Sequence, residues 1–237
     1  MKSRFFSNLR HPVRTLQTAA ARARTIALKR THALPSVRLS EIVDETTVEE
    51  DFISDDRGLP RVDLSALVAV ARSSAPKTVV ELGTSYGNST ANVCRAAPEA
   101  RIHTVNALPE QLSGILVTWA LSKQDIGRVF RSHGYADRVN QVYCDTADLD
   151  LSAHIDGCAV DLGVIDACHD PEYVVADFLK VAPFVDRNGI VLLHDTHPNM
   201  RGHLWASYLA CMNLRGQGYD VRHIQGTWWG AWRPHWA

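Results

Sequence analysis

The sequence lacks the features that mark disulfide-rich, zinc-binding and membrane-spanning chains. Its five cysteines are odd in number, widely spaced and contain no CxxC pair. This pattern favours a reducing compartment and argues against a disulfide framework or a zinc site. No apolar run approaches the roughly 20 residues of a membrane span, and no secretory apolar segment follows Met1. We therefore expect a cytoplasmic protein.

The sequence also lacks an overall excess of either charge. Its formal net charge is −1, with 46% hydrophobic and 22% charged residues, over a length of 237 residues. Such a chain has no global attraction for nucleic acid or anionic membrane. The composition is that of an ordinary globular protein, and the length accommodates one large α/β domain with extensions. A small molecule is the expected partner, and nucleic acid is not.

Charge is nevertheless uneven near the start. Residues 1–40 carry Lys and Arg but no acid, whereas residues 41–56 are rich in Asp and Glu. Apolar residues at roughly helical spacing in the basic segment predict a helical extension. A segment of this kind is typical of a transit peptide, a peripheral membrane helix or an arm that docks on a partner, including a second copy of the chain. It is equally typical of a solvated helix folded on its own domain. The predicted organisation is an extension at 1–57 and one domain at 58–237.

Strand and helix patterns alternate after residue 57. The helices are expected at residues 64–71, 88–97, 124–133, 171–181 and 200–214. The strands are expected at residues 78–82, 101–105, 139–144, 160–166, 190–193, 219–225 and 228–233, with Asn188-Gly189 as a turn before the fifth. This alternation predicts βαβ units and a mostly parallel, seven-stranded sheet with helices on both faces. The apolar stretch 112–123 does not fit the alternation, and is either a longer core helix or a lid over a pocket.

The most informative segment is residues 78–90, in which a β-branched run ends in an acid and passes into Gly83 and Gly87. A helix is expected to begin just after, at Asn88 or Ser89. Glycine lets the backbone approach a ligand closely, and free N–H groups at a helix start attract anions. The spacing does not match G-x-G-x-x-G, and no Gly-Lys-Ser or Gly-Lys-Thr follows, so dinucleotide and P-loop sites are disfavoured.

Three stretches in order resemble one family. Residues 81–90 are similar to the first motif of class I S-adenosylmethionine-dependent methyltransferases, in the variant found in small-molecule O-methyltransferases. Residues 160–173 and 189–197 are similar to the fourth and fifth strand motifs of its macrocin and macrolide-sugar branch. The resemblance implies a Rossmann-like fold and S-adenosylmethionine as cofactor.

The resemblance also implies which residues contact that cofactor. The glycine loop would lie under its methionine part, Glu81 would orient the amino group, and Asp145-Thr146 would hold the adenine. Asn106 stands where relatives have an acid for the ribose, although an amide can both donate and accept. Asp145 is also read as a turn residue. The full set is Glu81, Gly83, Thr84, Ser85, Tyr86, Gly87, Ser89, Asn106, Asp145, Thr146 and Asp166.

Acids and a histidine at the predicted strand ends suggest the chemistry. Methylating a hydroxyl requires that its proton be removed by a base or that a metal acidify it. Asp166 ends the fourth predicted strand and His169 follows in the loop, so we expect both to be catalytic, with His169 as general base. A histidine that caps the helix at Pro171 is the alternative.

A metal site is the second expectation at these strand ends. Asp166 and Asp195 would offer carboxylates for Mg²⁺ on neighbouring strands. Thr196 stands where metal-dependent relatives of the catechol type have Asn, and completes the predicted ligand set. His194 and His197 could join, which would favour a softer metal.

The expected function is methyl transfer to a hydroxyl of a small molecule, either a sugar or a secondary metabolite. The indole-rich tail, with Trp228, Trp229, Trp232 and Trp236, is either sheet core or a wall of the acceptor pocket. Two alternatives stay open. One is a hydroxylase-type relative of the same branch. The other is a non-catalytic cofactor-binding scaffold that docks through its basic N-terminal arm.

Overall fold

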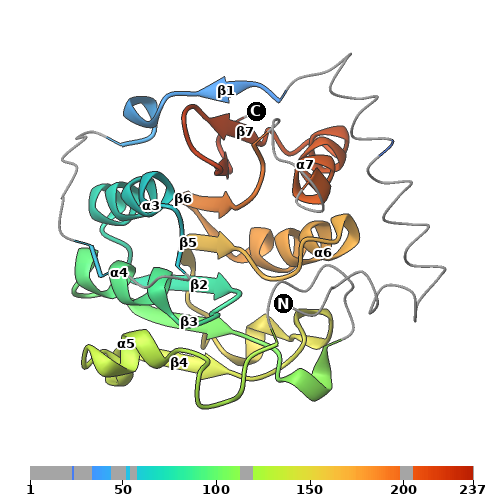
Figure 1. The fold of residues 1–237 in the computed structure, drawn as a ribbon. Coiled ribbons are helices and arrows are strands. Elements are labelled where there is room, and N and C mark those ends of the chain that lie inside the picture. Colours follow the sequence, from blue (N-terminus) through green and yellow to red (C-terminus); the bar gives the residue numbers. More distant parts are fainter. Residues whose placement is uncertain are drawn as a thin grey trace.

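The protein is described here from a computed structural model (Figure 1). The structure describes Ala23 and residues 34–43, 52–53, 58–112, 120–197 and 205–236. Most of the basic segment 1–40, residues 113–119 of the apolar stretch and residues 198–204 therefore lie outside the described part. Within the described part, no helix is long and apolar enough to cross a membrane.

An eight-stranded sheet forms the middle of the fold, with strand order β1-β7-β8-β6-β5-β2-β3-β4. The pairs β1·β7, β6·β5, β5·β2, β2·β3 and β3·β4 are parallel, and β8 runs antiparallel to both neighbours. The strands are β1 (Ser36–Val37), β2 (Thr78–Leu82), β3 (Arg101–Val105), β4 (Val139–Val142), β5 (Val160–Ile165), β6 (Val185–Leu193), β7 (Arg222–Ile224) and β8 (Gly230–Trp232). The expected α/β class is confirmed, with one strand more than predicted.

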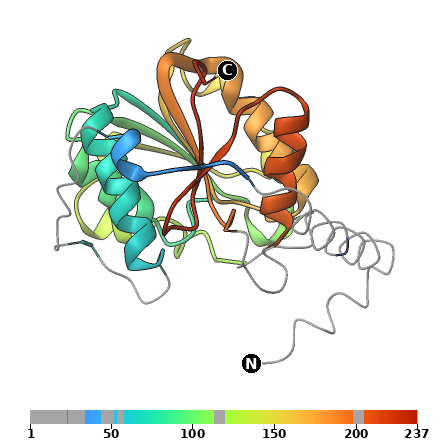
Figure 2. The same ribbon diagram turned by 90° about the horizontal axis from the view of Figure 1, so that it is seen from above.

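Helices cover both faces of the sheet (Figure 2). α3 packs on α4 on one face, and α6 packs on α7 on the other. The α-helices are α3 (Arg61–Ser74), α4 (Asn88–Ala96), α5 (Arg128–Ser132), α6 (Pro171–Val181) and α7 (Trp205–Gly216). The 3₁₀ turns are η1 (Leu39–Glu41), η2 (Pro109–Gln111), η3 (Ala136–Arg138), η4 (Thr146–Asp148), η5 (Leu151–Ala153) and η6 (Ala182–Phe184).

Two hydrophobic layers follow from the two-residue period of the strands. In β6, Ile190 and Leu192 belong to the core under α3 and α4, while Val191 and Leu193 belong to the core under α6 and α7. Side chains alternate between the faces of a strand, so a sheet covered on both sides needs apolar residues at nearly every position. This explains the uninterrupted apolar runs of the central strands.

Several predicted elements differ in extent from the observed ones, and two of these differences have a clear local reason. β6 runs through Asn188-Gly189, where a turn was expected, because these residues form a bulge in which the Asn188 N–H donates to Asp186 Oδ1 at 2.8 Å. The helix expected at 124–133 is only Arg128–Ser132, because it begins after Gly127 at φ 71°.

The first strand lies in the segment expected to be an extension. β1 pairs with β7, and Val37, Ile42 and Val43 are buried in the core under α3. Residues 34–43 thus pack on the main domain. The boundary at residue 57 stays a prediction.

Candidate active site

The glycine loop and Asp166 meet where the strand order changes direction. From β2 the chain proceeds outward to β3 and β4, whereas β5 and β6 lie on the other side of β2. Ligands of open α/β sheets bind outside the carboxyl ends of the strands at this point. Gly83, directly after β2, has φ 107°, and a Cβ there would lie 2.3 Å from the Asp166 carbonyl oxygen. Only glycine lets the loop lie against the end of β5.

The rest of the loop is held by its neighbours. The Ser85 N–H donates to Asn106 Oδ1 at 2.9 Å, and the Ser85 carbonyl accepts from the Gly127 N–H at 2.9 Å. Gly87 precedes α4 with φ 84°, and a Cβ there would lie 2.7 Å from Phe130 Cδ1. The buried Tyr86 accepts from the Val129 N–H through its carbonyl. Asn106 therefore shapes the loop, and its expected contact with a ribose stays a prediction.

Glu81 is buried at the end of β2 among hydroxyl groups. Its carboxylate accepts from the hydroxyls of Ser89, Thr90 and Thr104, and Thr84 Oγ1 lies 2.7 Å from Thr104 Oγ1. Burial raises the pKa of Glu81, against the three hydroxyl hydrogen bonds, which lower it. The network joins β2, β3 and the first turn of α4. The expected contact of Glu81 with an amino group is not tested by these bonds.

The residues after β4 form a tight turn. Asp145 Oδ1 accepts from the Ala147 N–H at 3.0 Å and caps η4, as the turn interpretation of Asp145 expects. Thr146 is buried, as is Asp177 of α6, and neither carboxylate oxygen of Asp177 has a hydrogen-bond partner within the described residues. Burial raises the pKa of Asp177 to about 7, although Thr146 and Lys180 act in the opposite direction. Both predicted adenine contacts therefore lie at the carboxyl edge of the sheet, and their role stays a prediction.

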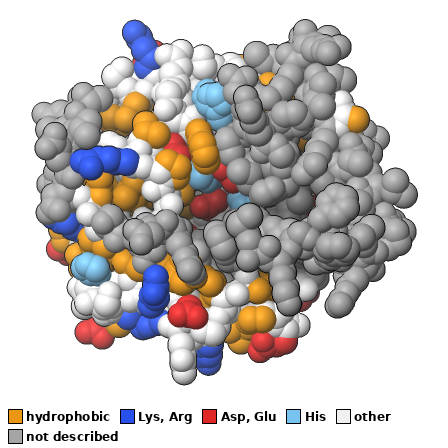
Figure 3. Space-filling view, viewed as in Figure 1, with side chains coloured by type: hydrophobic (Ala, Val, Ile, Leu, Met, Phe, Trp, Pro, Cys, Tyr) orange, Lys and Arg blue, Asp and Glu red, His pale blue; other side chains and the backbone are white. Residues whose placement is uncertain are grey.

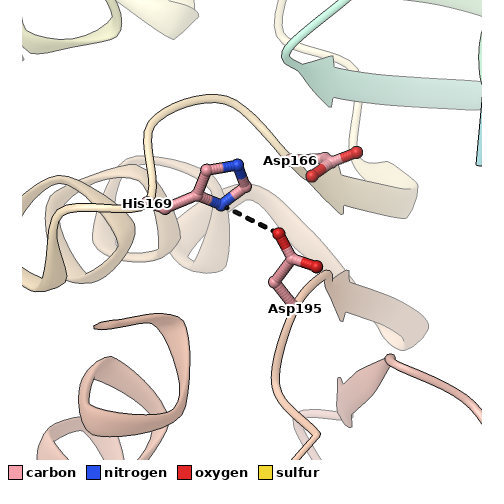
Figure 4. Close-up of side chains that lie close together, drawn as sticks. All are labelled: Asp166, His169 and Asp195. Atoms are coloured by element: carbon pink, nitrogen blue, oxygen red, sulfur yellow. Dashed lines mark ion pairs between the residues drawn. The ribbon is translucent and has the colours of Figure 1, made fainter. Parts of the chain in front are cut away.

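Asp166, His169 and Asp195 come together across the ends of β5 and β6 (Figure 4). One potential ligand atom from each lies within 4.8 Å of the others. His169 Nδ1 is 3.2 Å from Asp195 Oδ2, and both residues are buried. The Asp166 side chain is 25% exposed. Figure 3 shows acidic and histidine side chains in the middle of this face, beside hydrophobic ones.

Sequence patterns assign no role to Asp63 and make His194 only an optional metal ligand. In the structure, His194 Nε2 is 3.2 Å from Asp63 Oδ2, and its Nδ1 is 3.3 Å from Asp166 Oδ1 and 3.4 Å from Asp195 Oδ1. Burial alone would lower the pKa of His194, but the surrounding carboxylates outweigh it and raise that pKa well above its ordinary value. The sequence signal that points to Asp63 is an acid inside the otherwise largely apolar run 62–71.

Asp195 and Thr196 follow β6 in a constrained loop. Asp195 has φ 60°, in the left-handed region that non-glycine residues seldom adopt. Burial raises the pKa of Asp195, with His194 and His169 acting to lower it. The hydroxyl of Thr196 donates to the Trp228 carbonyl at 3.2 Å. Thr196 as a metal ligand stays a prediction.

The comparisons with known proteins agree with this geometry. Residues 80–196 match the family model described as a methyltransferase domain. The matched segment includes the glycine loop and the cluster at the ends of β5 and β6. A search of curated protein sequences finds no match.

Solved structures resemble the chain over most of its length. They include the S-adenosylhomocysteine-bound methyltransferase PaMTH1 of Podospora anserina (18% identity, 91% of this chain and 94% of that one, TM-score 0.55). They also include the O-methyltransferase TomG of Streptomyces achromogenes, involved in tomaymycin synthesis and solved with S-adenosylmethionine (16%, 89% and 94%, TM-score 0.54). The calicheamicin methyltransferase CalS11 is a third (15%, 92% of both chains, TM-score 0.57). At these identities the likeness concerns the fold.

Proposed function

We propose that this chain, a class I S-adenosylmethionine-dependent methyltransferase by its matched domain and its fold, methylates a hydroxyl group of a small molecule. The observation that carries the proposal is the Asp166, His169 and Asp195 cluster, which adjoins the glycine loop at the switch point of the sheet. When bound, the cofactor supplies a methyl group on a positively charged sulfur, and its transfer to a hydroxyl releases one proton.

The cofactor residues we propose lie along the carboxyl ends of four adjacent strands. The loop at 83–87 follows β2, Asn106 follows β3, Asp145 follows β4 and Asp166 follows β5. The loop ends at the first turn of α4, whose N–H groups and dipole favour a carboxylate. The closeness of Gly83 to Asp166 leaves the cofactor loop beside the acid cluster. This arrangement fits an elongated cofactor with a carboxylate at one end.

His169 is the general base of the proposal. Its Nδ1 faces Asp195 Oδ2 at 3.2 Å, and this contact sets the orientation of the ring. A neutral imidazole protonated on Nδ1 carries its basic lone pair on Nε2. Nε2 then takes the proton of the acceptor hydroxyl, and Asp195 stabilises the resulting imidazolium. A positioned base of this kind contributes about 10²- to 10⁴-fold in rate.

We also propose that this cluster binds a divalent cation. Asp166 and Asp195 have the carboxylate oxygens that suit Mg²⁺, and His169 would add an imidazole, which suits softer ions. If His169 binds a metal it does not act as the base, so the two roles are separable. If a chelator leaves methyl transfer unchanged, the metal hypothesis is rejected and His169 as general base stands.

The acceptor class we propose is a sugar or a secondary metabolite. Its support is the fold shared with TomG, which is involved in tomaymycin synthesis, and with the calicheamicin methyltransferase CalS11. The test is transfer of labelled methyl from S-adenosylmethionine to a panel of phenols and p-nitrophenyl glycosides. Label in a methyl ether supports the proposal, and label recovered only on nitrogen or sulfur nucleophiles contradicts it.

A further inference from the structure

Asp63 is a buried acid of α3 and lies outside the matched segment 80–196. Three of its polar contacts go to two distant parts of the chain. Its Oδ2 faces His194 Nε2 at 3.2 Å, and its Oδ1 accepts from the Trp228 N–H at 2.7 Å. Its carbonyl accepts from Trp229 Nε1 at 2.8 Å. One residue thus joins α3 to the loop after β6 and to the segment that enters β8.

His194 carries this link to the carboxylates of the site. Its second ring nitrogen, Nδ1, faces Asp166 Oδ1 at 3.3 Å and Asp195 Oδ1 at 3.4 Å. The ring also packs against Trp229, with centroids 4.5 Å apart. A ring with acceptors at both nitrogens and an indole against it has little freedom to rotate. The positions of both carboxylate groups therefore depend on the position of this imidazole.

Asp195 completes the connection to the proposed base. Its Oδ1 faces His194 and its Oδ2 faces His169 Nδ1 at 3.2 Å. The plane of this carboxylate is set by two imidazoles, one on each oxygen. The contacts form a continuous series, Asp63–His194–Asp195–His169, in which each step measures 3.2 to 3.4 Å.

We propose that Asp63 is a positioning residue that, through His194 and Asp195, fixes the orientation of the His169 ring. The inference rests on the proposed function for the role of His169, but the link itself is a property of the structure. Without the imidazole between them, three carboxylates would face one another in a buried space, where like charges repel. A merely structural Asp63 would only tie the segment that enters β8 to α3, through the Trp228 main-chain N–H and the Trp229 indole.

Asp63→Asn separates these two readings. The amide keeps an oxygen for the Trp228 N–H and replaces the oxygen that faces His194 Nε2 by an NH₂ donor. The shape of α3 is retained while the link to His194 changes. The matched control is Asp161→Asn at the opposite end of the sheet, where Asp161 Oδ2 accepts from the N–H groups of Lys77 and Thr78 at 2.8 and 2.9 Å.

The readout is the ¹⁵N NMR spectrum of the histidine rings in the full chain, assigned with His194→Gln and His169→Gln. Asp63→Asn should shift the ring nitrogens of both His194 and His169, whereas Asp161→Asn should shift neither. Affinity for S-adenosylmethionine, measured by calorimetry, should stay within about twofold in both variants. The methyl-transfer rate should fall about 10-fold or more with Asp63→Asn alone, as when a residue that holds a ligand or base in place is lost.

A shift confined to His194, or no shift at all, overturns the inference. If Asp63→Asn does not fold, His194→Gln tests the same link, and an unchanged His169 ring then overturns it. Methyl transfer that survives His169→Ala while the NMR shifts appear as expected has a different meaning. It removes His169 as base, and so the proposed mechanism, while the structural link stands.

Discussion

Gly83 lies against the main chain of Asp166, so closely that a Cβ at Gly83 would be 2.3 Å from the Asp166 carbonyl oxygen. This contact brings the loop after β2 to the end of β5. It connects the segment expected to hold the cofactor with the acid cluster expected to do the chemistry.

Gly83→Ala should be strongly destabilising. The new methyl group meets backbone atoms, and φ 107° is also unfavourable for alanine. The matched control is Gly134→Ala, where φ is 78° but no atom lies within 4 Å of the added Cβ. Gly134→Ala should lose stability only through backbone strain, of order 1–3 kcal/mol. The loss of stability in Gly83→Ala should be larger, because the steric contact adds to the strain. Thermal unfolding of both variants measures the difference, and equal losses would show that the close contact is unimportant.

Glu81→Gln should lower stability by about 1–3 kcal/mol. Three hydroxyls donate to the Glu81 carboxylate, and an amide offers only one oxygen with an NH₂ in place of the other. Thr90→Val removes a single donor and should have the smaller effect. Denaturant unfolding at fixed pH compares the two variants. A Glu81→Gln protein as stable as the wild type would contradict the network.

Asp177→Asn should stabilise the protein at alkaline pH. Burial raises the pKa of Asp177 to about 7, so the folded state resists its ionisation. Below the unfolded pKa of about 4, Asp177 is protonated in both the folded and the unfolded state, and the free energy of unfolding has its full value. As pH rises from 4 to 7, the acid ionises more readily in the unfolded state, and this stability is lost. The advantage of the amide should therefore grow between pH 4 and pH 7, with an upper bound on the order of 4 kcal/mol. Melting curves at pH 4 and pH 8 test this, with exposed Asp137→Asn as control; a pH-independent difference would refute it.

His169→Ala should reduce methyl transfer by about 10²- to 10⁴-fold, because the proton of the acceptor hydroxyl then has no positioned base. Cofactor affinity should change little, since the cofactor residues we propose lie at 81–106 and 145–166. The control is His133→Ala, an exposed histidine after α5. Full activity of His169→Ala would contradict the role of His169 as base. A bound cation, or the acidity of the acceptor hydroxyl itself, would then have to lower the barrier.

Much of the fold is predictable from the sequence because its signals are local. The strands at 78–82 and 101–105 and the helix at 171–181 have the predicted bounds. Buried β-branched runs specify the first two, and proline at a helix start specifies the third. Asn188-Gly189 is a local turn signal, but the neighbouring strand keeps it within β6 as a bulge. The start of the predicted helix at 124–133 depends on Gly127, whose N–H donates to the Ser85 carbonyl in the distant loop.

The candidate site is predictable only in part, because some of its contacts join residues that lie far apart in the sequence. Asp166, His169 and Asp195 follow adjacent strands, so topology alone brings them together. The pairing of Asp63 with His194 spans 131 residues. No spacing rule joins two such positions, and the contact becomes visible only once α3 is placed on the sheet.

The central claim is that the loop after β2 and the acid cluster beside it form a site for S-adenosylmethionine and methyl transfer. Calorimetric titration of the full chain with S-adenosylmethionine tests it most directly. We predict saturable binding of one cofactor per chain, and loss of that binding in Gly83→Ala at a temperature where this variant is folded. The absence of binding to the wild-type chain, or equal binding by the folded variant, would contradict the account.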